Sequence, residues 1–174
     1  MEKSVRHNKW YAQEYANVSD MQWRQAMEAI GRCDYTGADS ILDVGCGDGK
    51  IPRYLAEHLE HGNIIGIDLT KDMIRYARKE HAYQANLFFE QMSADEIQFK
   101  QRFDIIFSFS CLHWVGEQQK VWNGFYRNLT PKGKVVCGFQ VGHEHFWNTV
   151  IEHQQDPYWK PFFRTSTILS IILP

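Results

Sequence analysis

Short apolar segments alternate with amphipathic segments along most of the chain. The apolar segments have the length of strands, and apolar residues with helical spacing separate most of them. Strands that alternate with helices through short connections form a parallel sheet with helices on both faces. The sequence therefore predicts an α/β fold with a doubly wound, mostly parallel, Rossmann-like sheet. The expected strands are residues 40–44, 63–67, 86–90, 104–109 and 134–140, and the expected helices are a pair within 8–31, then 50–60, 71–81 and 117–129.

Three of the expected helices or turns begin with residues that favour a helix start. Ser19-x-x-Gln22 has the form of a capping box, and so has Ser93-x-x-Glu96. Thr70 is a suitable N-cap for the helix that follows it.

The stretch D-S-I-L-D-V-G-C-G-D-G-K, residues 39–50, ends the first expected strand in alternating glycines at positions 45, 47 and 49. Bare backbone there lets N–H groups approach a ligand, and the N-terminus of the next helix favours anionic groups. The second strand ends in Asp68, where an acidic side chain can accept hydrogen bonds from ribose hydroxyls. These features indicate a nucleoside ligand with a ribose and a negatively charged arm.

Composition excludes several other classes of protein. A net charge of −2 argues against a surface that neutralises nucleic-acid phosphates or anionic lipid. The first ten residues have no apolar core of a secretory signal, and no apolar run is long enough to span a bilayer. The cysteines, Cys33, Cys46, Cys111 and Cys137, include no C-x-x-C pair. We therefore expect reduced thiols, no metal site and a cytoplasmic location.

The ordered set D-V-G-C-G-D-G, Asp68 and F-D-I-I-F-S-F-S resembles motifs of the class I S-adenosylmethionine-dependent methyltransferases. The resemblance covers roughly residues 8–162. Within that class, F-S-F-S-C-L-H-W-V at 107–115 and Leu129-Thr-Pro-Lys-Gly133 resemble the juvenile hormone acid, trans-aconitate and malonyl-carrier-protein O-methyltransferases. The N-terminal W-x-A-x-x-Y-x-x-x-S-x-x-Q is similar to the helix that covers the cofactor in that group.

The resemblance implies a role for particular residues toward S-adenosylmethionine and its product S-adenosylhomocysteine. Tyr15 would lie on the covering helix, Asp68 would hold the ribose and Leu69 would contact the adenine. Ser108 would lie near the sulfonium, while Gln22 and Trp114 would position the substrate. The remaining cofactor residues implied are Asp43, Gly45, Cys46 and Gly47 around the methionine arm, and Ser93, Ala94 and Asp95 at the adenine amino group.

The reaction that the resemblance implies is O-methylation of a small, apolar carboxylic acid. A carboxylate is already ionised at neutral pH, since the pKa of a carboxylic acid in water lies near ~4. No general base is then required, and positioning and partial desolvation provide most of the acceleration. His113 is accordingly interpreted as a packed or hydrogen-bonded histidine, unless the acceptor is a hydroxyl or an amine.

Several of these residues have plainer interpretations. Asp68 could cap a helix, Gln22 and Asp95 could belong to capping boxes, and Trp114 could be a core aromatic. His143, His145 and His153 are interpreted as surface residues rather than as a metal cluster.

The family pattern has seven strands, whereas five can be placed here. We expect an N-terminal helical segment over residues 1–38, the cofactor-binding core over 39–141, and a C-terminal helix with a shortened tail over 142–174. The fifth strand would then be an open edge, against which Thr167–Leu173 could pair within the chain or in a homodimer. The alternative function is a catalytically inactive or truncated protein that binds S-adenosylmethionine or S-adenosylhomocysteine and dimerises through this edge. An NAD-dependent dehydrogenase is disfavoured by the glycine spacing.

Overall fold

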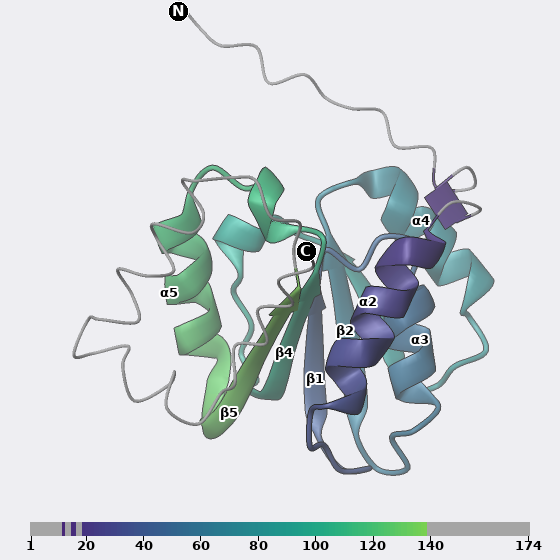
Figure 1. The fold of residues 1–174 in the computed structure, drawn as a ribbon, viewed down its shortest axis with the longest axis horizontal. Helices are drawn as coiled ribbons and strands as arrows, with labels where there is room; N and C mark the ends of the chain where they lie inside the picture. Colours follow the sequence, from purple (N-terminus) through teal and green to yellow (C-terminus); the bar gives the residue numbers. More distant parts are fainter. Residues whose placement is uncertain (1–11, 13–14, 17–18, 139–174) are drawn as a thin grey trace, which may run out of the picture.

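A computed structural model describes residues 12, 15–16 and 19–138 and shows a sheet of five parallel strands (Figure 1). Their order is β3-β2-β1-β4-β5, so the chain reverses its direction of winding between β1 and β4. The predicted α/β, doubly wound fold class is confirmed. The strands are β1 (Ser40–Val44), β2 (Asn63–Asp68), β3 (Leu87–Gln91), β4 (Phe103–Phe109) and β5 (Leu129–Gly138).

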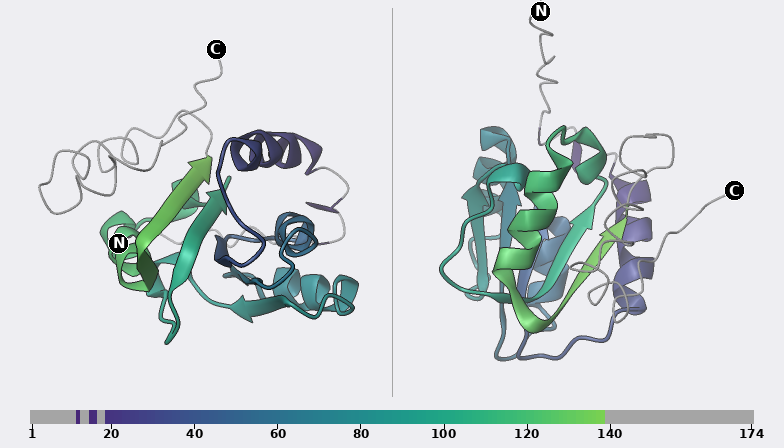
Figure 2. Two further views of the ribbon diagram at one scale, coloured as in Figure 1. Left: turned by 90° about the horizontal axis from the view of Figure 1, so that it is seen from below. Right: turned by 90° about the vertical axis from the view of Figure 1, so that its left-hand side faces the viewer.

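Helices cover both faces of the sheet. The helices α2, α3 and α4 pack on one face, and α5 with the single turn η1 packs on the other (Figures 1 and 2). The helices are α2 (Asp20–Gly31), α3 (Lys50–Ala56), α4 (Lys71–Glu80) and α5 (Gln118–Asn128), with short 3-10 turns η1 (Ala94–Glu96) and η2 (Leu112–Trp114).

The central strands are buried on both faces because each face of the sheet is covered. Alternate residues of β1 contribute to two separate cores: Ile41 packs with α2 and α3, and Leu42 packs with α5. A strand buried on both sides reads as a continuous apolar run rather than an alternating one. This explains why β1, β2 and β4 could be recognised from short apolar segments.

The connection between α5 and β5 differs from the prediction. We expected a helix to residue 129 and a strand from 134, whereas α5 ends at Asn128 and β5 begins at Leu129. Leu129 pairs with Phe103 before the register shifts, so that Lys134 pairs with Ile105. The strand therefore starts earlier than predicted and bulges over residues 130–133. The Pro-Lys-Gly sequence, which favours a turn, lies in this bulge.

Both predicted capping boxes are wrong. Ser19 precedes α2 but makes no side-chain capping bond, and its Oγ accepts a hydrogen bond from Lys50 Nζ at 3.0 Å. Ser93 Oγ donates to Asp95 Oδ1 instead of capping η1. Thr70 occupies the N-cap position of α4 as expected, without a side-chain capping bond.

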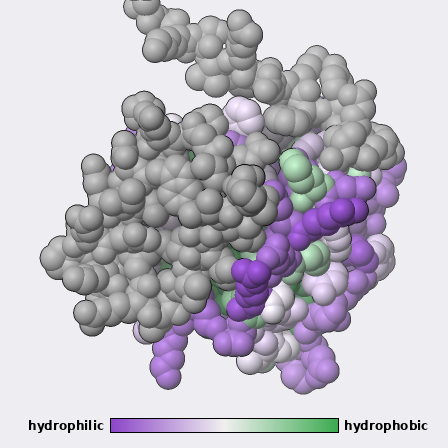
Figure 3. Space-filling view, in the orientation of Figure 1, coloured by the Kyte–Doolittle hydropathy of each residue, from purple (hydrophilic) through white to green (hydrophobic). Residues whose placement is uncertain are grey.

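Some expectations fall outside the described residues. Ala12, Tyr15 and Ala16 are helical, while the rest of 8–18 is not described. The proposed pairing segment 167–173 and the three C-terminal histidines also lie outside. Within residues 12, 15–16 and 19–138 we find no helix with the length and hydrophobicity of a membrane span. On the face that carries α2 the visible described side chains are mostly polar, with scattered apolar ones (Figure 3).

We predict that Phe107→Ala lowers the free energy of unfolding by about 3–5 kcal/mol, because the side chain is fully buried in the sheet and its loss leaves a cavity. The matched change Phe88→Ala, on the edge strand β3 where the side chain is 52 % exposed, costs about 1 kcal/mol or less. Urea denaturation of the two variants measures both values. Equal losses would contradict this account of the core.

Candidate functional site

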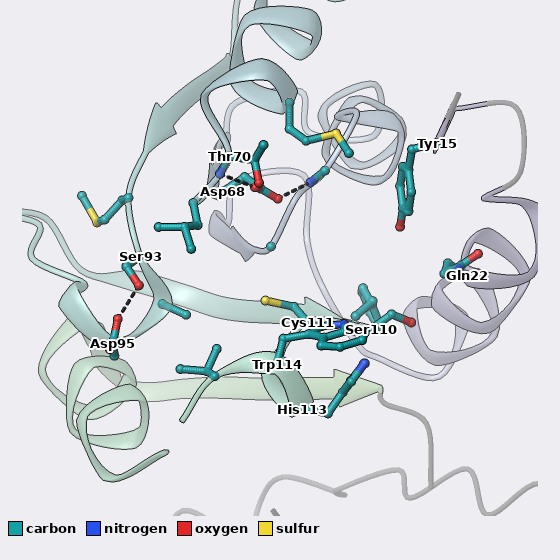
Figure 4. A pocket seen from close by; sticks show the side chains of 18 of the residues that line it. Tyr15, Gln22, Asp68, Thr70, Ser93, Asp95, Ser110, Cys111, His113 and Trp114 are labelled. Atoms are coloured by element: carbon teal, nitrogen blue, oxygen red, sulfur yellow. Dashed lines mark hydrogen bonds between the residues drawn. The ribbon is translucent and has the colours of Figure 1, made fainter. Parts of the chain in front are cut away.

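A cavity of about 500 Å³ opens at the carboxyl ends of β1, β2 and β4 (Figure 4). This is the switch point of the sheet, where ligands bind in open α/β folds. Tyr15 and Gln22 lie on one side of the cavity, and Ser93 and Asp95 lie at the opposite end (Figure 4). The structure thus brings together ten of the residues that the sequence singled out: Tyr15, Gln22, Gly45, Gly47, Asp68, Leu69, Ser93, Ala94, Asp95 and Trp114.

Two glycines of the turn after β1 stand where there is no room for a side chain. Gly45 has a φ of 81°, and a Cβ there would lie 2.4 Å from the side chain of Cys111. Gly49 has a φ of 83°, and a Cβ there would lie 2.7 Å from the ring of Phe89. Both positions combine a left-handed backbone with close neighbours, so only glycine fits. The turn closes over β2, since Gly45 N donates to Ile67 O at 2.8 Å.

Asp68 joins two loops at the end of β2. Its carboxylate accepts hydrogen bonds from Gly47 N at 3.1 Å and from Thr70 N at 2.8 Å (Figure 4). The interpretation of Asp68 as a helix cap is therefore replaced by a bridge between the glycine turn and the start of α4. Each carboxylate oxygen keeps further acceptor capacity toward the cavity. Burial raises the pKa of this carboxyl above its usual range, and the backbone N–H groups of Thr70 and Gly47 oppose that rise.

A second, deeper carboxyl lies close to Asp68. Asp43 is only 1 % exposed, and among the described residues its Oδ2 has no hydrogen-bond partner. Burial, together with the charges of Asp68 and Asp48, raises its pKa to about 8. A buried carboxyl of this kind is stabilised by a positive group brought to the turn above it. The end of the cavity at the glycine turn therefore suits a ligand with a cationic centre, in addition to the anionic group that the sequence predicts beside the start of α3.

The wall of the cavity that faces the glycine turn carries polar side chains, and none of its described residues is Lys or Arg. It is formed by α2 and by the segment after β4, with Gln22, His113 and Trp114 facing the cavity (Figure 4). Among the described residues, Gln22 Oε1 is buried without a hydrogen-bond partner, so this side chain has an acceptor free for a ligand, and its amide group also carries N–H donors.

Trp114 is not the core aromatic that one interpretation offered. Its side chain is 65 % exposed and stands at the mouth of the cavity. Its ring lies beside that of His113, with centroids 5.0 Å apart. Leu69, 68 % exposed, and Met21 also border the cavity, so the mouth is apolar.

Three predicted cofactor residues do not line the cavity. Ser108 is fully buried between strands, where its hydroxyl donates to Val44 O at 2.8 Å. Cys46 is buried against Gly66 of β2, and Asp43 lies beneath the turn. The side chains of these three residues point into the protein, whereas their neighbours Gly45, Gly47 and Asp68 line the cavity.

The sequence analysis missed most of the segment that follows β4. Phe109, at the end of β4, and Ser110 and Cys111 after it line the cavity, together with Thr70 and Met92, which follow β2 and β3, and Met73 of α4. Ser110 has a φ of 52°, which is uncommon for a residue other than glycine and often marks a functional loop. The position of this segment at the carboxyl end of a central strand was the signal that could have identified it.

Two titratable groups of the wall stay protonated at neutral pH. Burial raises the pKa of the Tyr15 hydroxyl to about 12, with added repulsion from the charges of Asp48 and Asp68. Burial also raises the pKa of the Cys111 thiol to about 12. Neither group is therefore available as a base or as a thiolate nucleophile near pH 7.

Comparison with known proteins agrees with this geometry. A family model described as a methyltransferase domain matches residues 41–133. Juvenile hormone acid O-methyltransferase of Bombyx mori is 27 % identical, over 66 % of this chain and 47 % of the relative. Trans-aconitate 2-methyltransferase of Azoarcus sp. is 28 % identical, over 71 % of this chain and 48 % of the relative. The chain thus spans about half the length of the relatives it matches.

Solved structures support the same assignment. Phosphoethanolamine N-methyltransferase 2 of Haemonchus contortus was solved with phosphomonomethylethanolamine and S-adenosylhomocysteine. It is 27 % identical to this chain and superposes with a TM-score of 0.61, over 76 % of this chain and 33 % of that one. Since the matched family model covers more than half of the chain and the fold agrees, the chain belongs to the methyltransferase domain family, within the class I S-adenosylmethionine-dependent methyltransferases.

Proposed function

We propose that this chain binds S-adenosylmethionine in the cavity and transfers its methyl group to the carboxylate of a small, apolar acid. The observation that carries the proposal is the division of the cavity. One end has the bare glycine turn and Asp68, and the other has the amide of Gln22 and the indole of Trp114. The described lining contains no Lys or Arg and therefore no ready site for a phosphate-bearing acceptor.

In this proposal the cofactor spans the carboxyl ends of β1 and β2. The glycine turn receives its amino-acid arm, the outer lone pairs of Asp68 accept the ribose hydroxyls, and Leu69 packs on the adenine. Ser93, Ala94 and Asp95 close that end of the cavity. When bound, the cofactor supplies an electrophilic methyl group. Buried Asp43 favours the positive charge of the amino-acid arm across the turn.

The acceptor needs placement rather than deprotonation. A carboxylate is ionised near neutral pH, so its oxygen can attack directly. Gln22 and Trp114 offer N–H donors that would hold the carboxylate in line with the methyl group. Such positioning accelerates the reaction most when it keeps the reacting atoms near contact. Met21, Leu69 and Trp114 give the mouth an apolar border, which suits an apolar body on the acid. Two relatives named for acid substrates support this choice.

We also propose how the three segments of the chain divide these tasks. Residues 1–38 contribute the wall with Tyr15 and α2, residues 39–141 form the cofactor core, and 142–174 follow β5. The competing function is a binding protein without turnover that forms homodimers through the outer edge of β5. Binding of S-adenosylhomocysteine without methyl transfer to any acid would favour that function.

Removing the Asp68 carboxylate is the first test of the cofactor site. We predict that Asp68→Ala weakens S-adenosylhomocysteine binding at least about tenfold, because hydrogen bonds to a charged group are lost along with the bridge to Gly47 and Thr70. Calorimetric titration measures the affinity. Asp72→Ala is the control, since Asp72 is an exposed acid in the first turn of α4. Equal affinities of wild type and Asp68→Ala would contradict the assignment.

Gln22 tests the acceptor end. We predict that Gln22→Leu raises the KM for the acid about tenfold or more and leaves S-adenosylhomocysteine affinity unchanged, because in the proposed arrangement the amide holds the acceptor and not the cofactor. Gln119→Leu, on the exposed face of α5, serves as the control. Steady-state kinetics with a panel of apolar acids give the KM. An unchanged KM, or turnover of amines in place of acids, would contradict the proposed acceptor.

The raised pKa of Asp43 makes cofactor affinity depend on pH. In the ligand-free protein this carboxyl is protonated below about pH 8. A cation at the turn favours its ionised form, so binding releases a proton and affinity rises with pH. We predict an increase of up to about tenfold per pH unit between pH 6 and 8 that then levels off. Asp43→Asn should remove the rise. Calorimetry from pH 6 to 9 measures it, and an equal rise in the variant would contradict the role of Asp43.

A further inference from the structure

The side chain of Lys50 joins two parts of the chain that are distant in sequence. Lys50 opens α3 directly after the glycine turn. Its Nζ donates to the carbonyl oxygen of Ala16 and, at 3.0 Å, to Ser19 Oγ. The same Nζ lies 3.6 Å from Asp48 Oδ2, in the turn itself. One ammonium group therefore holds the N-terminal residues against the turn that follows β1.

The two residues that Lys50 binds, Ala16 and Ser19, are close in sequence to residues that line the cavity. Ala16 follows Tyr15, whose ring packs on the turn: a Cβ on Gly47 would lie 3.3 Å from Tyr15 Cε1. Ser19 immediately precedes α2, the helix that carries Gln22 into the cavity. Lys50 does not line the cavity itself. It would therefore affect a ligand through the residues that it holds or through its charge, and not by direct contact.

The positive charge of Lys50 also compensates the negative charge of Asp48 in the turn. Asp48 has only 6 % of its side chain exposed, whereas Lys50 has 36 % exposed. Asp48 in turn is one of the carboxylates that surround Asp43 and Tyr15. Charge-assisted hydrogen bonds of this kind are stronger than those between neutral groups. Removing the ammonium would take away this anchor of the segment that carries Tyr15, together with the cation that pairs with Asp48.

We propose that Lys50 is a positioning residue that holds Tyr15 and the start of α2 on the glycine turn and thereby sets the affinity for the amino-acid arm of the cofactor. This inference rests on the proposed function of the cavity. Lys50, the first residue of α3, would act on the cofactor from outside the cavity. The adenosine end, at Asp68 and Leu69, is expected to depend on Lys50 much less. Asp68 reaches the turn through Gly47 N, but neither Asp68 nor Leu69 contacts Lys50 among the hydrogen bonds and ion pairs of the described residues.

The test compares two ligands in the chain of 174 residues. S-adenosylhomocysteine contains the amino-acid arm, whereas 5′-methylthioadenosine lacks it. We expect Lys50→Met to weaken S-adenosylhomocysteine binding about tenfold or more and to leave methylthioadenosine binding within about twofold. Lys50→Arg restores most of the loss, since a guanidinium can donate to the same acceptors. Calorimetric titration measures both ligands, and thermal unfolding checks that each variant is folded.

Two further variants make the result specific. Lys134→Met is the matched control: Lys134 Nζ also donates to a distant backbone carbonyl, that of Asp34 at 2.6 Å, but lies away from the cavity. Ser19→Ala removes one acceptor of Lys50 while keeping its charge, and should weaken S-adenosylhomocysteine binding in the same direction by a smaller factor. If Lys50→Met does not fold, Ser19→Ala decides the question.

The outcomes separate this inference from the proposed function. Selective loss of S-adenosylhomocysteine binding in Lys50→Met, or in Ser19→Ala, supports the positioning role. Unchanged binding, equal weakening of both ligands, or the same effect from Lys134→Met overturns it while leaving the cofactor site in place. A wild-type chain that is folded and binds neither ligand overturns the proposed function, and the inference with it.

Discussion

The carboxylate of Asp68 is the interaction on which the site depends. By accepting from Gly47 N and Thr70 N, it fixes the turn after β1 against the loop after β2. The two loops end neighbouring strands of the sheet, and the cavity lies between them and the segment after β4. The turn can take this shape because Gly45 and Gly49 have no Cβ atoms, which would meet the side chains of Cys111 and Phe89. Backbone geometry and one acidic side chain together form the floor of the cavity.

Electrostatics then decides what the floor can bind. Asp43, Asp48 and Asp68 lie close enough together to help burial raise the pKa of the deepest of them, Asp43, to about 8. Part of this repulsion is balanced by Lys50, which pairs with Asp48 and ties the N-terminal residues to the turn. The remaining imbalance favours a cationic ligand, which is consistent with the methyltransferase family to which the chain belongs. The same groups thus stabilise the walls of the cavity and select the charge of its ligand.

Much of this arrangement was predictable from the sequence, for a physical reason. Strands buried on both faces appear as short apolar runs, and glycines with positive φ mark the turn, so β1, β2, β4 and the position of Asp68 could be placed. Side-chain direction could not. Ser108 points between strands, Ser19 binds Lys50 instead of capping α2, and Trp114 stands exposed at the mouth. Each depends on contacts between residues far apart in the chain, which local patterns do not encode. The early start of β5 at Leu129 has the same origin in its pairing with Phe103.

The most direct test of the central claim is a crystal structure of this chain with S-adenosylhomocysteine. The account predicts ligand density in the cavity, with the ribose hydroxyls within hydrogen-bond distance of the Asp68 carboxylate and the amino-acid arm over the Gly45–Gly47 turn. Density at another place, or a ligand in the cavity whose ribose does not reach Asp68, would contradict it.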